Sequence, residues 1–281
     1  GSVQTLPILN AENIETVSLA SWGFDAEISS QNSLIGAANA VVESVAKIVA
    51  MGGDYKNIRL SFQEYFEKLG NSPKKWGKPL ASLLGAYDAQ MNFELAAIGG
   101  KDSMSGSFQD IHVPPTLISF ACANGEKKNI ISPEFKKAGN KLYLFNHISQ
   151  ENGMPNYGDL KQIFDFIFEN IKAKKIVSVK TIKEGGVAVA LSKMSFGNHL
   201  GAEIELAEDL LLTKNIGSLI IESSAVLEND LLQVIGEISN SSNLKINTFE
   251  FNIEKLLEAW KGTFEELFPT AEEKKMVVEI D

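Results

Sequence analysis

The chain has 281 residues, of which 44% are hydrophobic and 22% are charged, so its composition is typical of one large globular domain or two ordinary ones. Its formal net charge of −10 argues against a nucleic-acid or anionic-membrane surface, because both partners require a basic face. No apolar stretch is expected to reach the length of a membrane span. The single cysteine, Cys122, lies in the apolar run "LISFACA", so we expect a buried, inert thiol in a protein of the reducing cytoplasm.

Apolar spacing predicts alternating strands and helices in the first part of the chain. Apolar side chains recur on one broad helical face over 34–51, with Ser33 placed to cap this helix and Gly52-Gly53 to end it. Pro73 is expected to act as a breaker in the polar, aromatic stretch 63–77. The remaining expected elements are one or two strands within 14–28, strands over 57–62, 93–98 and 115–123, and a helix over 78–92.

A change of composition then divides the chain. The segment "NGEKKNIISPEFKKAGN" at 124–140 is polar and contains a proline and two glycines, which favours a domain boundary. Beyond it we expect strands over 141–147, 176–182, 217–223 and 244–251, and helices over 158–173, after Gly185-Gly186, over 226–238 and over 253–267. The pattern predicts two α/β domains, 1–125 and 126–268, followed by a charged tail, 269–281. Gly1-Ser2 resembles the remnant of a tag, so we expect a piece of a longer polypeptide.

The stretch "LAAIGGKDSMSG" combines residues that suit a phosphate group. Gly99 and Gly100 allow a ligand to approach the backbone closely, and Lys101 offers a positive charge. Asp102 can accept hydrogen bonds or contact a metal, and Ser103 offers a hydroxyl. The spacing is not that of a Walker A loop, which needs a Ser or Thr directly after the lysine. Taken alone, these residues fit a phosphate-binding loop or a Gly-Gly turn with a solvated tip.

Two further groups of residues remain ambiguous from their types alone. Glu43 and Lys47 are spaced i,i+4 on the first long helix, and an exposed ion pair is the plainest interpretation. In "KTIKEGG", Glu184 could complement a helix dipole where Gly185 and Gly186 open the helix. A glycine-containing helix start is weak evidence for anion binding.

The run "GGKDSMS" resembles the Gly-Gly-Lys-Asp-Ser-(Met/Leu)-Ser signature of the large, single-chain phosphoribosylformylglycinamidine synthases of purine biosynthesis. The resemblance continues through "SLASWGFDAEISSQNSLIGAANAVVESVAKIVAMGG", "NIRLSF" and "TIKEGGVAVALSKMSFGNHLGAEIEL", and covers about residues 15–265 in the expected order. It implies an aminoimidazole ribonucleotide synthase-like fold, with an N-terminal and a C-terminal α/β domain. The chain would be the second of two such halves of the synthetase core.

The resemblance also implies a reaction and its partners. The family uses ATP, Mg²⁺ and glutamine to convert formylglycinamide ribonucleotide into its amidine, so the chain is expected to be part of a glutamine-dependent carbon–nitrogen ligase. The first half, with its catalytic histidine, and the glutaminase domain would be the partners, and this chain alone is expected to be inactive. By position in the related Gly-Gly-Asn-x-Ser loop, Gly100 would contact ATP and Ser103 the substrate. A lysine ammonium cannot bind Mg²⁺, so Lys101 is expected to contact a phosphate.

The sequence departs from the family at its auxiliary nucleotide site. There the family binds Mg-ADP through a helix Glu and Asn and through an Asp-x-Ser-Asp-Gly-Gly segment. Glu43 remains here as the one candidate metal ligand. Lys47 replaces the Asn, and the other replacements are Thr181, Lys183 and Glu184, ahead of the retained Gly185 and Gly186. The auxiliary site is therefore expected to be degenerate and without Mg-ADP, with lysines in place of the metal charge.

Two rival interpretations follow from the same residues. Thiamine-monophosphate kinase, selenophosphate synthetase and hydrogenase maturation proteins share the architecture but lack "GGKDSMS". Alternatively, the chain is a noncatalytic half that only supports the catalytic one. The lost metal ligands favour this second interpretation, and the intact "GGKDSMS" opposes it.

Overall fold

The first part of the chain forms a five-stranded sheet. The computed structural model describes residues 1–10 and 13–269. Within them, the sheet order is β1 (Ser2–Thr5), β2 (Thr16–Gly23), β7 (Thr116–Glu126), β3 (Arg59–Tyr65) and β4 (Ala96–Ser103). Only β3 and β4 pair in parallel. Strand β7, predicted over 115–123, lies in the middle of the sheet. The segment 14–28 contains one strand and then the start of a short helix, α1 (Ala26–Gln31), capped by the Asp25 side chain.

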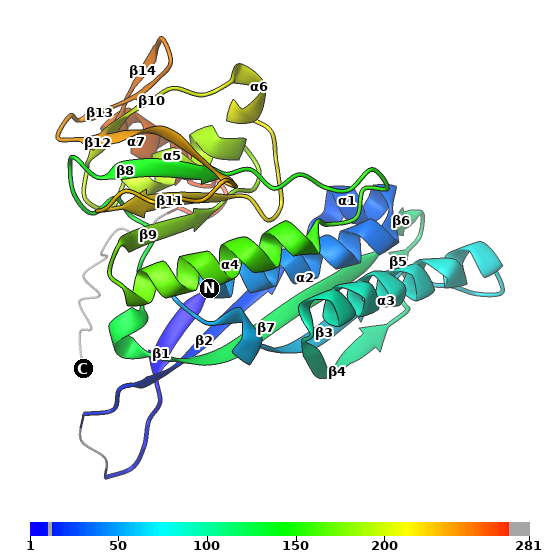
Figure 1. Cartoon of the computed structure of the whole chain (residues 1–281). Coiled ribbons are helices and arrows are strands. Elements are labelled where there is room, and N and C mark those ends of the chain that lie inside the picture. Colours follow the sequence, from blue (N-terminus) through cyan, green and yellow to red (C-terminus); the bar gives the residue numbers. More distant parts are fainter. Residues whose placement is uncertain (11–12, 270–281) are drawn as a thin grey trace, which may run out of the picture.

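Two long helices cover one face of this sheet (Figure 1). Helix α2 (Ser33–Ala50) begins one residue earlier than predicted, because the Asn32 side chain, rather than Ser33, accepts hydrogen bonds from the first helical amides. Helix α3 (Pro73–Phe93) also begins earlier than predicted. Pro73 occupies the first turn, where its missing N–H costs nothing, so it starts this helix instead of breaking it.

The opposite face of the five-stranded sheet lies open in the described part of the chain. Trp22 and Phe120 are paired neighbours on this face and are about half exposed. Cys122 lies on the same face of β7 and is exposed, so the expectation of a buried thiol is wrong. Cys122 is exposed because side chains alternate along β7. Ala121 points toward the helices, and the residues on either side of it point outward.

The Gly-Gly-Lys-Asp-Ser stretch lies within strand β4 and does not form a loop. In the ladder Leu60 pairs with Ala97 and Phe62 with Gly100, so β4 carries one extra residue and bulges. Gly99 absorbs the bulge with a φ of 146°. A Cβ on Gly100 would lie 2.3 Å from the Phe62 carbonyl oxygen, so only glycine allows this close approach.

The described residues after 126 form a seven-stranded sheet with four helices. In spatial order its strands are β14 (Phe249–Asn252), β13 (Asn243–Ile246), β10 (Gly201–Ile204), β12 (Leu232–Ser239), β8 (Lys141–Phe145), β11 (Leu219–Ser223) and β9 (Ile176–Thr181). The helices are α4 (Tyr157–Lys172), α5 (Gly186–Ser195), α6 (Glu208–Leu211) and α7 (Ile253–Gly262). The smaller elements of the chain are the hairpin β5 (Ser107–Phe108) and β6 (Ile111–His112), and the 3-10 turns η1 (Tyr55–Asn57) and η2 (Lys127–Asn129).

One predicted helix in this part is wrong. The segment 226–238 contributes strand β12 to the middle of the sheet. A bulge near Val234 and Gly236 puts Ile235 and Ile238, three residues apart, on the buried side. This spacing imitates a helical repeat, because a bulge shifts the two-residue period of a strand.

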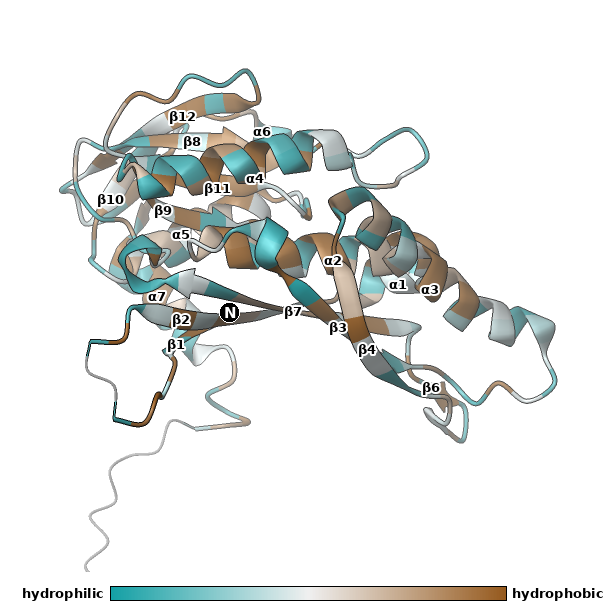
Figure 2. Ribbon diagram, turned by 60° about the horizontal axis from the view of Figure 1, so that its bottom comes forward, coloured by the Kyte–Doolittle hydropathy of each residue, from teal (hydrophilic) through white to brown (hydrophobic). Residues whose placement is uncertain are grey.

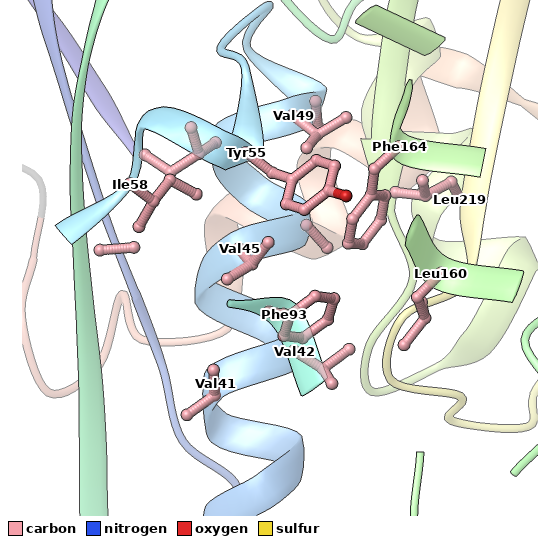
Figure 3. Packing of buried hydrophobic residues seen from close by; sticks show 14 of the residues in the cluster. Val41, Val42, Val45, Val49, Tyr55, Ile58, Phe93, Leu160, Phe164 and Leu219 are labelled. Carbon is pink, nitrogen blue, oxygen red and sulfur yellow. The ribbon is translucent and has the colours of Figure 1, made fainter. Parts of the chain in front are cut away.

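A continuous apolar core joins the two sheets through α2 (Figure 3). Val42 and Val45 of α2 belong to the same buried cluster as Phe164 of α4 and Leu219 of β11. Phe93 stacks on Phe164 with ring centroids 6.1 Å apart. A second cluster lies between α5 and the seven-stranded sheet. The strands change from one sheet to the other within 127–140, at the predicted boundary, and the division into two domains stays a prediction.

Helix α2 is long and apolar enough to cross a membrane by length and composition, contrary to the sequence-based expectation. Figure 2 colours much of it as hydrophobic. Most of its residues are buried against other parts of the chain, so it has the properties of a core helix.

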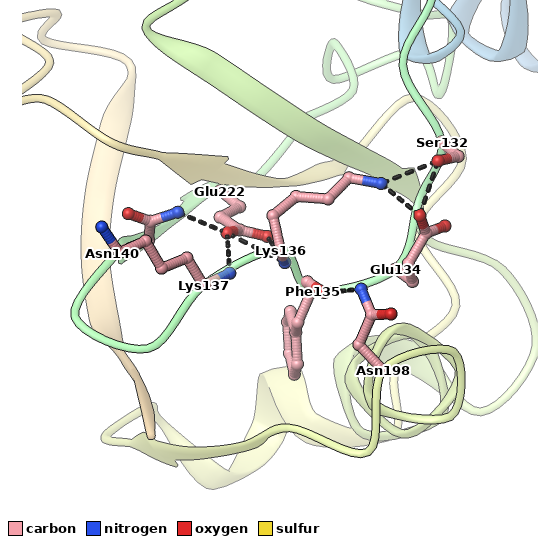
Figure 4. Close-up of polar contacts among 8 residues, drawn as sticks. All are labelled: Ser132, Glu134, Phe135, Lys136, Lys137, Asn140, Asn198 and Glu222. Carbon is pink, nitrogen blue, oxygen red and sulfur yellow. Dashed lines mark hydrogen bonds and ion pairs between the residues drawn. The ribbon is translucent and has the colours of Figure 1, made fainter. Parts of the chain in front are cut away.

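A buried carboxylate fastens the segment between the sheets (Figure 4). Glu222 of β11 accepts hydrogen bonds from the Lys136 and Lys137 main-chain amides and, at 2.6 Å, from the Asn140 side chain. Burial raises the pKa of Glu222, and these donors oppose that shift. The network holds the connecting segment against the second sheet. The predicted tail, apart from Pro269, lies outside the described residues.

Candidate functional site

The Gly-Gly-Lys-Asp-Ser residues lie on the free edge of the five-stranded sheet. Lys101 pairs with Gln63 and Ser103 with Tyr65, so both side chains face the open side of the sheet. Asp102 pairs with Glu64 and therefore faces the helix side. The Lys101 ammonium donates a hydrogen bond to the Asp102 main-chain oxygen at 2.8 Å. The strand thus presents the lysine and the serine together on one face and the aspartate on the other.

Cavities lie on both sides of β4. On the open side, a cavity of about 520 Å³ is lined by Gly99, Gly100, Lys101 and Phe120 together with neighbouring β3 residues. On the helix side, a cavity of about 510 Å³ lies between β3, β4 and α3. Both volumes are in the range of small-molecule sites. The predicted phosphate-binding residues therefore border space on either face of the strand.

Glu64 is a functional candidate that was missed from the sequence. It lines the cavity on the helix side, is only 6% exposed, and its Oε1 atom has no hydrogen-bond partner among the described residues. Burial, with a smaller contribution from Asp102, raises the pKa of Glu64 to about 7. The sequence did contain a signal for it. Glu64 follows Leu60 and Phe62 at two-residue spacing, so all three side chains lie on the buried face of the strand.

Two lysines of the predicted degenerate site contact Glu43. The Lys47 and Lys183 ammonium groups lie 2.6 Å and 2.7 Å from the same Glu43 Oε1 atom. The other carboxylate oxygen accepts a hydrogen bond from the Phe24 amide at 3.1 Å. Glu43 is 3% exposed, so the expected exposed ion pair is in fact a buried carboxylate held by two lysines.

The Trp22 residue packs against both lysines of this group. Lys47 donates a hydrogen bond to the Trp22 carbonyl at 2.7 Å, and its ammonium lies 4.5 Å from the centre of the indole ring. Lys183 approaches the same ring at 5.4 Å. Burial lowers the pKa of Lys47, although the neighbouring Glu43 opposes this shift. We call Glu43, Lys47 and Lys183 the lysine–glutamate cluster.

The other predicted members of the auxiliary site are not in contact with Glu43 and lie around the lysine–glutamate cluster. Glu184 is exposed and its carboxylate lies 3.8 Å from the Lys214 ammonium, which contacts Asp25 more closely at 2.8 Å. Gly185, with a φ of 78°, and Gly186 open α5 as expected, and no acidic side chain lies in its first turn. Thr181 lines a separate cavity of about 380 Å³ together with Lys47.

The charges of this region do not form a metal site. The described residues contain no group of three or more His, Cys, Asp or Glu side chains that could hold an ion. Mg²⁺ requires oxygen ligands, and the Glu43 oxygen that could serve is already in contact with two ammonium groups. The residues present therefore do not fit a magnesium ion at the lysine–glutamate cluster.

Comparison with known proteins places the chain beside curated PurL subunits and a group of solved structures. A scan against protein-family models finds no match. The chain is 25% identical to phosphoribosylformylglycinamidine synthase subunit PurL of Methanocaldococcus jannaschii, over 85% of this chain and 37% of that protein. It thus spans little more than a third of that relative.

Solved structures agree in fold. Thermotoga maritima PurL complexed with ATP has a TM-score of 0.71 at 12% identity, over 86% of this chain and 44% of the other. The complex of T. maritima PurL with FGAR has a TM-score of 0.70 at 12% identity, over 86% of this chain and 46% of the other. Thiamine-monophosphate kinase from Stenotrophomonas maltophilia has a TM-score of 0.59 at 11% identity, over 83% of this chain and 85% of the other. The chain is therefore similar in sequence to PurL subunits, and its mixed α/β architecture is that of PurL and of aminoimidazole ribonucleotide synthase-like proteins, as predicted.

Proposed function

We propose that this chain is the second half of the synthetase core of a phosphoribosylformylglycinamidine synthase, of the large single-chain type. The similarity to PurL over 85% of the chain supports the family, and "GGKDSMS" supports the single-chain type. The whole protein would convert formylglycinamide ribonucleotide, ATP and glutamine into formylglycinamidine ribonucleotide in the cytoplasm. The chain would act there as one part of a glutamine-dependent ligase of purine biosynthesis.

The observation that carries this proposal is the placement of Lys101 and Ser103 on the open face of an edge strand. Lys101 lines the cavity on this face, and Ser103 lies two residues further along the same face of the strand. The exposed Trp22 and Phe120 on the same face supply an apolar surface of the kind that a partner domain buries. We infer that the first half of the core covers this face and completes the active site.

The proposed roles follow from the chemistry of the strand. Gly99 and Gly100 leave room for phosphate oxygens close to the backbone. Lys101 would turn from the Asp102 carbonyl to a phosphate oxygen and neutralise charge there, and Ser103 would donate its hydroxyl to the substrate. In the proposed reaction the formamide oxygen is activated at the expense of ATP, with Mg²⁺ bound by the rest of the enzyme, and ammonia then displaces phosphate.

The test uses alanine variants in the full-length enzyme. A charge-assisted hydrogen bond contributes about 1.5–3 kcal/mol, so Lys101→Ala should lower kcat/KM by roughly 10- to 150-fold. Ser103→Ala loses a neutral contact and should lower it by roughly 2- to 13-fold. Lys245→Ala, an exposed lysine of the second sheet, is the control, and glutaminase turnover measured alone should not change.

A second candidate is a noncatalytic half that only supports its neighbour. The lysine–glutamate cluster favours it, because two ammonium groups contact Glu43, the residue that by resemblance would be a magnesium ligand. Full synthetase activity with unchanged KM in both alanine variants would establish this alternative. In either case the chain alone should show no amidine formation, and calorimetry with Mg-ADP should detect weak binding or none.

A further inference from the structure

The cavity on the helix side of β4 has a polar end and an apolar wall. It measures about 510 Å³. Its lining residues are Phe62, Glu64, Leu83, Ala86, Tyr87, Gln90, Ala97, Gly99, Gly100, Lys101 and Asp102. The apolar wall comes from α3 and the adjacent strands, and Leu83 and Tyr87 of that wall are about half exposed. The polar end holds two carboxylates, Glu64 and Asp102, at paired positions of neighbouring strands.

Glu64 stands out against a nearby carboxylate that is equally buried. Glu67 is also 6% exposed, but its oxygens are held by Lys75 at 2.7 Å and by Lys78 at 2.5 Å. Glu64 has no ion-pair partner in the described part of the chain, and its Oε1 accepts no hydrogen bond there. A buried carboxylate without partners costs stability. A binding partner from outside the chain would remove this cost.

We propose that this cavity binds an organic cation, an amidinium or ammonium group carried on a small apolar or aromatic body, whose charge is received by Glu64 with Asp102 beside it. The Lys101 ammonium is directed to the Asp102 main chain and does not neutralise Glu64. The apolar wall of Phe62, Leu83 and Tyr87 matches the uncharged part of such a molecule.

A metal ion fits this cavity less well than an organic cation. Two carboxylates converge here, and the described residues hold no group of three or more possible acidic, histidine or cysteine ligands. Much of the lining is apolar, which a hydrated divalent ion would not contact favourably. The cavity borders Gly99, Gly100 and Lys101 of the proposed synthetase site, whereas Ser103 faces the other side of the sheet. The inference rests on Glu64 and the apolar wall, and not on the proposed synthetase function.

The experiment titrates the 281-residue chain with benzamidine, benzylamine and neutral benzamide at pH 8, followed by amide NMR shifts. Benzamidine has nine heavy atoms, so we expect a dissociation constant of roughly millimolar size. Benzamide, which has the same shape without the charge, should bind at least about tenfold more weakly. Comparing benzamidine with benzylamine shows whether the cavity prefers an amidinium or an ammonium group.

Variants locate the binding in the cavity. Glu64→Gln keeps the side-chain volume and should weaken benzamidine binding by roughly 10- to 150-fold. Glu169→Gln, at an exposed position of α4, should leave it unchanged. Equal binding of benzamidine and benzamide by the unaltered chain would overturn the proposal without any variant. So would undiminished binding to a folded Glu64→Gln chain. Glu64-dependent shifts with Mg²⁺ alone, in the absence of benzamidine binding, would also overturn it in favour of a metal site.

Discussion

Replacing Glu43 by glutamine should destabilise the fold strongly, because two ammonium groups would lose the carboxylate that they share. Glu43 is 3% exposed, and Lys47 and Lys183 contact the same oxygen at 2.6 Å and 2.7 Å. Removing one partner of a buried ion pair costs about 3–5 kcal/mol. The two lysine side chains keep 16% and 27% exposure and can regain some hydration. We therefore expect a loss of roughly 2–4 kcal/mol in the free energy of unfolding.

Urea denaturation of the Glu43→Gln chain measures this loss directly. The matched control is Glu169→Gln, which removes the exposed Lys172–Glu169 pair on α4, with atoms 3.0 Å apart. An exposed pair contributes little, so the control should change stability by less than about 0.5 kcal/mol. In a Lys183→Met background, Glu43→Gln should cost less, because one stranded charge has gone.

The result that would refute this reasoning is a loss no larger than in the control. The carboxylate would then be without energetic importance in the folded chain. A rise in stability on adding millimolar Mg²⁺ to the unaltered chain, absent in the Glu43→Gln chain, would contradict the conclusion that the lysines exclude the metal.

Three further predictions concern other parts of the structure. Gly85→Ala should destabilise the fold by about 1–3 kcal/mol or more, because its Cβ would lie 2.0 Å from the Leu34 carbonyl oxygen. Gly77→Ala, on the same helix with open space around it, should stabilise the fold by about 0.5–1 kcal/mol. Chemical denaturation compares the two variants. Glu64, with its pKa raised by burial to about 7, binds more protons in the folded than in the unfolded state between about pH 4.5 and 7, so stability should fall as pH rises through this window. Glu64→Gln should remove roughly 1–3 kcal/mol of that fall, and identical pH profiles for the two chains would contradict the buried position of this carboxylate. Cys122 should react with a thiol reagent in the folded chain nearly as fast as in urea, and a slow reaction would show that the outer face of the sheet is covered.

The sequence predicted the elements whose apolar pattern is regular and uninterrupted by a bulge. Helix α2 and strands β7 and β11 carry continuous apolar runs, and their positions are confirmed within a few residues. Shorter signals failed where a local irregularity changed the period. The bulge in β12 made a strand resemble a helix, and the bulge at Gly99 made a strand resemble a loop.

The candidate site was predicted in part. The grouping of Glu43, Lys47 and Lys183 followed from the family resemblance, since spacing alone relates only the first two. Their burial could not be predicted, because helix α2 has no exposed face, and this depends on elements that lie far along the chain. Glu64 was missed because strand β3 continues beyond the predicted end. Its last residues have a buried side because α3 lies next to them, and this packing cannot be read from the local sequence.

The position of α2 has a consequence for the order in which the chain can fold during synthesis. Its residues pack on β2 and β7 on one side and on α4 and β9 on the other. The ribosome releases α2 long before β9, so one apolar side of the helix stays uncovered while the intervening segments are made. A nascent chain that stops at Glu126 would expose this surface, and it would be a substrate for chaperones until the later strands arrive.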